Sequence, residues 1–113
     1  MPNTSTMHSR DRVNIQVATI DSTYTVSPDD DYVFAATAGG AFTATLPAAS
    51  SVRPGKEIHF KKTDVSANDF TVSRAGSDTI DGNNTRVLGA QYDQLTIVSN
   101  GANWFVLNAV LNA

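Results

Sequence analysis

Few side chains in this sequence could do acid–base chemistry. The chain has two histidines, His8 and His59, one glutamate, Glu57, and no cysteine. A nucleophilic triad needs an activated serine or cysteine, a histidine and an orienting acid, and no Gly-x-Ser-x-Gly turn is present to hold such a serine. A glycosidase needs two paired carboxylates, whereas the other acids are aspartates that nearly all fall in turn-like stretches. The sequence therefore predicts a protein that is not an enzyme and that uses no cofactor.

Three adjacent aspartates, Asp29, Asp30 and Asp31, form the densest group of candidate metal ligands. A helix-flanked calcium loop places oxygen ligands at alternate positions, with a glycine and a distal glutamate, and this pattern does not follow here. Without cysteine, a thiolate zinc site is excluded as well. We interpret the aspartates as a turn with solvated carboxylates and predict no metal site.

The most apolar stretch of the chain runs from residue 104 to residue 110, near its end. Near-continuous apolar character in a strand indicates that both of its faces are covered. We expect one face to pack on the core and the other on a neighbouring sheet or a second subunit. Trp104 could instead stack on a sugar, but its place in this run favours packing. The residues predicted to pack in the core or between subunits are Trp104, Phe105, Val106 and Leu107.

The totals favour one small domain. The chain has 113 residues, of which 41% are hydrophobic and 17% are charged. This length suits one globular domain, and the charged fraction lies below the roughly 25% that is typical. No apolar run approaches the ~20 residues of a membrane span, and the N-terminus lacks the apolar segment of a signal peptide. The absence of cysteine fits assembly in a reducing cytosol, or stabilisation through oligomers.

The lysines gather around residues 56–62. We expect Ile58 and Phe60 to face inward and His59, Lys61 and Lys62 to face outward, as the solvated side of a strand. A phosphate-binding cluster is the alternative. The net charge of −3 argues against it, because a nucleic-acid binder needs a basic patch.

Short segments of alternating apolar and polar residues recur along the chain, which is typical of strands with one buried face. The strands that we expect are 13–20, 23–26, 32–37, 42–46, 57–62, 70–73, 85–88, 94–99 and 104–110. Gly39-Gly40 is a hairpin signal, and a short helical turn is expected at 48–52. The sequence thus predicts an all-β fold, a compact antiparallel sandwich or barrel of about nine to ten short strands.

The first twelve residues are polar and cannot bury enough apolar surface to order by themselves. We therefore divide the chain into an extended N-terminal arm, 1–22, and a β-domain, 23–113. The arm is either a loose tail or a segment that orders against a larger assembly. In the second case the contact residues would be Thr4, Thr6, His8, Arg10 and Arg12.

Four short motifs follow one another along the chain: Thr-Ala-Thr-Leu-Pro (43–47), Pro-Gly-Lys-Glu-Ile (54–58), Gly-Ser-Asp-Thr-Ile-Asp-Gly (76–82) and Asn-Gly-Ala-Asn-Trp (100–104). In this order they resemble a module of tail-fibre, head-fibre and other virion proteins of tailed bacteriophages. The resemblance covers about three quarters of the chain, from Tyr24 to Leu107. It implies a compact β-domain that trimerises on the surface of a virion, without catalysis.

This resemblance leads to two expectations of function. The first is a homotrimeric capsid decoration (cement) or short head-fibre protein, assembled in the host cytoplasm and bound through its arm to the major capsid protein on the capsid surface. The alternative is a module of a phage tail fibre that binds a receptor or a host-surface glycan. Its candidate ligand loops would hold Gly39, Gly40, Asp81, Asn83 and Asn84. Neither expectation includes a nucleic acid or a membrane.

Overall fold

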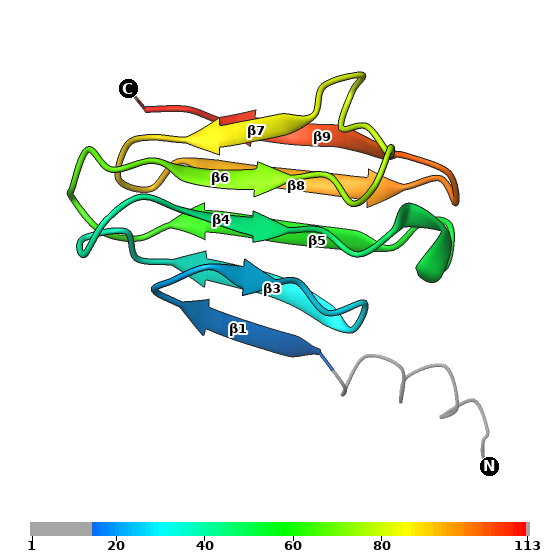
Figure 1. Ribbon diagram of the computed structural model, residues 1–113, viewed down its shortest axis with the longest axis horizontal. Coiled ribbons are helices and arrows are strands. Elements are labelled where there is room, and N and C mark those ends of the chain that lie inside the picture. The colour runs from blue at the N-terminus through cyan, green and yellow to red at the C-terminus, as the bar shows by residue number, and fades with distance from the viewer. Residues whose placement is uncertain (1–14, 113) are drawn as a thin grey trace, which may run out of the picture.

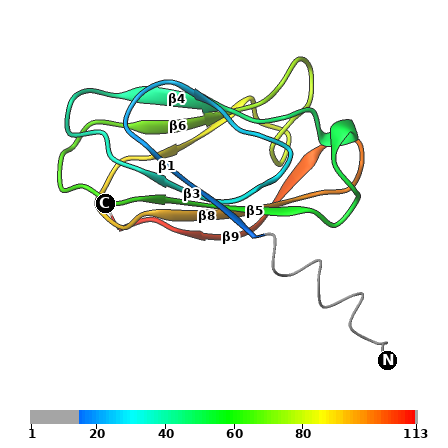
Figure 2. The ribbon, with the colours of Figure 1, turned by 90° about the horizontal axis from the view of Figure 1, so that it is seen from below.

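Two β-sheets pack face to face, as the side view in Figure 2 shows. The computed structural model describes residues 15–112. The elements (Figure 1) are β1 (Gln16–Ile20), β2 (Tyr24–Thr25), β3 (Asp30–Ala35), β4 (Phe42–Thr45), the 3-10 turn η1 (Ala49–Ser51), β5 (Glu57–Lys62), β6 (Phe70–Ser73), β7 (Thr85–Leu88), β8 (Gln94–Ser99) and β9 (Trp104–Val110). The prediction of an all-β fold is confirmed. Within these residues no helix is long and apolar enough to cross a membrane.

The strand order shows how the chain winds. The five-stranded sheet has the order β1-β3-β5-β8-β9, and the four-stranded sheet has the order β2-β4-β6-β7. From β1 to β6 the chain alternates between the sheets, so β1, β3 and β5 are parallel, as are β2, β4 and β6. The last three strands join antiparallel to their neighbours. The predicted antiparallel arrangement is therefore wrong: both sheets are mixed, and they do not close into a barrel.

The predicted hairpin at Gly39-Gly40 is also wrong, because the strands on either side of it lie in different sheets. Gly40 has a positive φ of 146° and donates to the Thr37 carbonyl, so a turn is present. Buried Thr37 is tied to the loop after β5 through its backbone N–H to Asp64 Oδ1 at 2.7 Å and its Oγ1 to the Asn68 carbonyl at 2.9 Å. These bonds hold the chain at the end of β3, from where it crosses to the other sheet.

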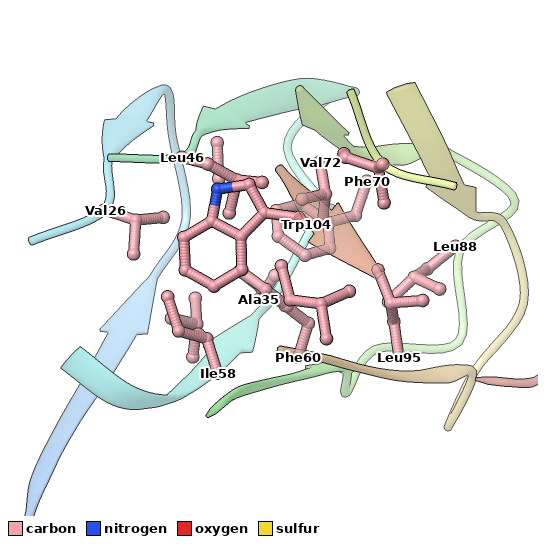
Figure 3. Close-up of a cluster of buried hydrophobic side chains, with 14 of the residues drawn as sticks. Val26, Ala35, Leu46, Ile58, Phe60, Phe70, Val72, Leu88, Leu95 and Trp104 are labelled. Atoms are coloured by element: carbon pink, nitrogen blue, oxygen red, sulfur yellow. The ribbon is translucent and has the colours of Figure 1, made fainter. Parts of the chain in front are cut away.

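The core lies between the sheets and centres on Trp104, which is surrounded by side chains from both of them (Figure 3). The indole Nε1 donates to the Pro47 carbonyl at 3.2 Å, so the one polar atom of the ring has a partner. Phe60 of β5 and Phe70 of β6 approach to 6.1 Å between ring centroids. The other buried hydrophobic residues are Ile20, Val26, Val33, Ala35, Ala44, Leu46, Ala49, Ile58, Val72, Ile80, Leu88, Leu95 and Ile97.

The boundary between arm and domain needs correction. Residues 16–20, which we assigned to the arm, form β1 and pair with β3 from Gln16↔Asp30 to Ile20↔Ala35. Ile20 reaches the core, so this segment is part of the domain. The candidate arm contacts Thr4, Thr6, His8, Arg10 and Arg12 lie outside the described residues.

The predicted orientation of Lys62 in β5 is also wrong. We expected it to face outward beside Lys61, but its side chain is fully buried. Strand alternation places it in phase with Ile58 and Phe60, on the inner side. Its Nζ donates to the Ser66 carbonyl at 2.6 Å, to the Asp64 carbonyl at 3.0 Å and to Asp64 Oδ1 at 3.2 Å. The ammonium is buried because oxygen atoms of the following loop surround it.

Candidate functional site

Exposed apolar side chains gather on the five-stranded sheet. Of the ten large hydrophobic side chains that are exposed between residues 15 and 112, eight lie on this sheet or within two residues of its strands. They are Ile15, Val17, Tyr32, Tyr92, Phe105, Leu107, Val110 and Leu111. Large exposed apolar patches are rare on monomeric proteins, so this sheet is the strongest candidate for a contact surface.

We call the side of this sheet that points away from the four-stranded sheet the outer face. The pairing register and strand alternation assign to it Val17, Thr19, Tyr32, Phe34, Glu57, His59, Lys61, Gln94, Thr96, Val98, Phe105, Asn108 and Val110. One row runs across all five strands, Val17↔Tyr32↔His59↔Thr96↔Asn108. The outer face therefore extends continuously from one edge of the sheet to the other.

The last strand, β9, is one of those edges, and the chain leaves most of it uncovered. Trp104 lies in the core, and Val106 is half-buried against it. Phe105 and Leu107 are exposed by 42% and 56%. The register shifts between Thr96 and Ile97, which adds one residue to β9. Of the four residues predicted for packing, two thus contact the core and two are exposed.

Asp81 binds the backbone at the start of the edge strand β9. It has a left-handed φ of 51°, its N–H donates to the Trp104 carbonyl at 3.1 Å, and its Oδ1 accepts from the Val106 N–H at 3.0 Å. The Trp104 N–H in turn donates to the Thr79 carbonyl at 2.9 Å. These bonds occupy the backbone groups through which another strand would otherwise pair. Asp81, a candidate ligand residue in the sequence, acts here as a cap on the sheet edge.

The two candidate ligand loops do not meet. Gly39 and Gly40 come directly before β4, whereas the loop with Asp81, Asn83 and Asn84 follows β6. Because β4 and β6 are parallel, the start of one and the end of the other lie at opposite ends of the sheet. The two loops therefore do not form one site.

An open groove of about 720 Å³ lies at one end of the outer face. Two pairs of its polar groups contact each other: Lys56 Nζ lies 2.7 Å from Asp31 Oδ1, and His59 Nε2 lies 3.5 Å from Glu57 Oε1. Asp29 and Arg53 also line the groove. The ring of Tyr32 stacks on His59 with 4.8 Å between centroids. Acidic and basic groups thus alternate in the groove, and its lining does not favour a ligand of one charge.

His59 also lies 3.0 Å from Thr96 Oγ1 through its Nδ1. A hydroxyl, an imidazole and a carboxylate in a row are the groups of a nucleophilic triad. Thr96 is only 6% exposed, however, so its hydroxyl lies below the surface, where a substrate carbonyl cannot reach it. The contact instead fixes the orientation of the imidazole on the outer face.

Two of the three consecutive aspartates, Asp30 and Asp31, have different partners, and Asp30 is not the solvated carboxylate that we expected. Asp30 is buried and accepts from the Tyr24 hydroxyl and the Ser27 N–H. Burial, this hydrogen bond and the negative charge of Asp30 raise the pKa of Tyr24 to about 12. For Asp31, burial raises the pKa, but the hydrogen bonds from Lys56 and the Gln16 N–H outweigh it, so the pKa lies below its usual value. No group of three histidine, aspartate or glutamate side chains within 15–112 is placed to hold a metal.

A closed polar cluster surrounds Asp64. Burial raises the pKa of Asp64, but hydrogen bonds from Ser66, from the Thr37 N–H and from Lys62 lower it by more. The resulting pKa lies well below the usual range. Asp64 is therefore a carboxylate at neutral pH, paired with the buried Lys62 ammonium. The cluster has a structural role, because it joins β3 to the loop after β5.

Two features of the candidate surface escaped the sequence interpretation. Val17 and Tyr32 were treated as ordinary strand residues, although both face outward. The signal was present in β1, where Val17 and Ile20 are out of phase and cannot share one face. The cap formed by Asp81 carried no such signal, because it depends on the position of β9.

The comparison with known proteins adds no relative. The chain matches no protein-family model, and no curated protein matches it.

Proposed function

We propose that the protein is a structural component of a tailed-bacteriophage virion, a homotrimeric decoration (cement) or short head-fibre protein on the capsid surface. The observation that carries the proposal is strand β9, an edge strand whose exposed residues include Phe105, Leu107 and Val110. An exposed apolar edge strand promotes aggregation of a monomer, whereas in an oligomer it can be buried between copies. The order of the four sequence motifs supplies the link to virion proteins.

Covering the exposed side chains of β9 would favour association. Burying a large apolar side chain completely is worth about 1.5–3 kcal/mol, and the side chains of β9 are roughly half exposed. Each would therefore gain on the order of 1 kcal/mol when a second copy covers it. Several such contacts add a few kcal/mol per copy, which offsets part of the roughly 4–15 kcal/mol that association costs, so further surface must contribute.

The arm has the role of attachment in this proposal. Three polar arms from one trimer would contact the major capsid protein, and their linkage raises the overall affinity through effective concentration. A deletion of residues 1–12 tests this role. We expect the truncated protein to keep the mass of the intact oligomer in light scattering and to lose co-sedimentation with capsids of the parent phage. Full occupancy of capsids by the truncated protein would contradict it.

The glycan-binding alternative has less support, because its candidate loops lie at opposite ends of the sheet and Asp81 is engaged with β9. A glycan array with the intact protein separates the two functions. Specific glycan binding without capsid binding would favour the tail-fibre module.

A further inference from the structure

We infer that copies of this chain contact one another through the outer face of the five-stranded sheet, with the stacked Tyr32 and His59 near its centre. The inference rests on the self-association in the proposed function and names the surface that carries it. The surface is wider than β9, since it reaches across the sheet to β1. The partner is a second copy of the same chain.

The first observation is the inverted pattern of β1. Val17 is 59% exposed on the outer face, and Ile15, in the same phase, is 52% exposed. Ala18 and Ile20 occupy the inner side instead. Two of the three large apolar residues around this strand, Ile15 and Val17, thus point away from the core. A strand with apolar residues on both sides is typical of one that is covered twice.

The second observation is the contrast with the opposite side of the molecule. The corresponding outward residues of the four-stranded sheet are Thr25, Thr43, Thr45, Thr71, Ser73, Thr85 and Val87. Six of these seven carry a hydroxyl, which suits a surface in contact with water. Six of the thirteen outer-face residues are apolar, against one of seven on the opposite side, so the outer face is the more apolar of the two.

Charge is the third observation. Asp31 and Glu57 at the groove and on the outer face are balanced by Lys56 and Lys61, and Asp31 and Lys56 pair directly. Around the threefold axis of a trimer each outer face would meet parts of both other copies, so like charges must not come together there. Lys61 lies over the Tyr92 ring at 5.7 Å, which places its charge beside an aromatic surface. A nearly neutral face with internal partners suits an identical copy better than a strongly charged macromolecule.

The outer face supplies part of the area that a stable oligomer needs. Five strands about 4.8 Å apart, with about six residues of 3.3 Å each, give a face of roughly 24 by 20 Å. Three such faces around a common axis bury on the order of 1,400 Å² in total, or about 500 Å² for each pair of copies, which is below the roughly 1,200–2,000 Å² of a standard interface. The exposed side chains along the edge strand β9 must therefore add to the contact. Contact by edge-to-edge pairing is less favourable, because Asp81 already occupies the Trp104 carbonyl and the Val106 N–H of β9.

The test compares matched valines at two sheet edges. Val17→Glu places a charge on the outer face, and Val87→Glu places the same charge on an exposed edge strand of the other sheet. With light scattering during size exclusion, we expect Val17→Glu to fall to the mass of one chain, 12.0 kDa. Val87→Glu should keep the mass of the wild-type oligomer. Circular dichroism spectra check that both variants are folded. Two variants of equal mass would overturn the inference.

A second measurement avoids the added charge. Because the chain has no cysteine, Val17→Cys and Val87→Cys each provide a single thiol. We expect a maleimide to label position 17 at least about tenfold more slowly than position 87 in the assembled protein, as burial in an interface predicts. Equal labelling rates would refute the interface.

The outcomes also separate this inference from the proposed function. A wild-type protein that is a single chain contradicts both. A wild-type oligomer that dissociates with Val17→Glu but never binds capsids supports the interface and contradicts the capsid role. A capsid-binding oligomer that stays intact with Val17→Glu supports the capsid role and contradicts the interface.

Discussion

Replacing Lys62 by methionine tests how the inner side of β5 is built. The Lys62 ammonium is fully buried and donates to three oxygen atoms of the following loop, including Asp64 Oδ1. Methionine keeps most of the side-chain length but removes the charge and all three donors. The Asp64 carboxylate would then stay buried without its cationic partner. Breaking one partner of a buried ion pair costs about 3–5 kcal/mol, and we expect Lys62→Met to fall in this range.

Lys61→Met is the matched control, since it changes the same atoms one residue earlier, on the outer face. Its Nζ lies over the Tyr92 ring at the surface, so we expect a cost below about 1 kcal/mol. Urea unfolding at one fixed protein concentration measures both variants, because self-association makes the midpoint concentration-dependent. Equal midpoints for the two variants would refute the assignment of Lys62 to the inner side.

Three further predictions follow from the structure. Trp104→Ala should cost about 3–5 kcal/mol in unfolding experiments, since it removes the centre of the core; full stability would show that Trp104 is not a core residue. Asp64 has a lowered pKa in the folded state, so its contribution is present above the unfolded pKa of about 3.9 and is lost as the pH falls below it. Acid titration of stability should therefore be flatter in Asp64→Asn, and an unchanged slope would contradict this. Asp81→Ala should uncap β9 and increase concentration-dependent aggregation in light scattering, whereas an unchanged scattering signal would exclude the cap.

Alternation along the chain predicted the positions of the strands well. The segments 70–73, 85–88, 94–99 and 104–110 coincide with β6, β7, β8 and β9. Alternation predicts on which face of a sheet a side chain lies. It does not predict which strands are neighbours, because it holds no information on strand pairing. The parallel pairs therefore could not be predicted. They depend on where the chain crosses between sheets, as it does after Thr37.

The surface was harder to predict than the fold. For Lys62 the charge suggested solvent, although its phase with Phe60 already indicated the inner side. The oxygen atoms of the following loop, including Asp64 Oδ1, make that burial favourable. Their position depends on the tertiary structure. The outer face likewise depends on strands far apart in the sequence. Val17 and Phe105 become parts of one surface only when β1 and β9 join the same sheet.

The central claim is that this protein works by assembling copies of itself. The most direct measurement is the mass of the wild-type protein in light scattering over a range of concentrations. We predict a particle of about 36 kDa, three times the 12.0 kDa of one chain. A single 12.0 kDa species that persists at roughly 100 μM would contradict the claim.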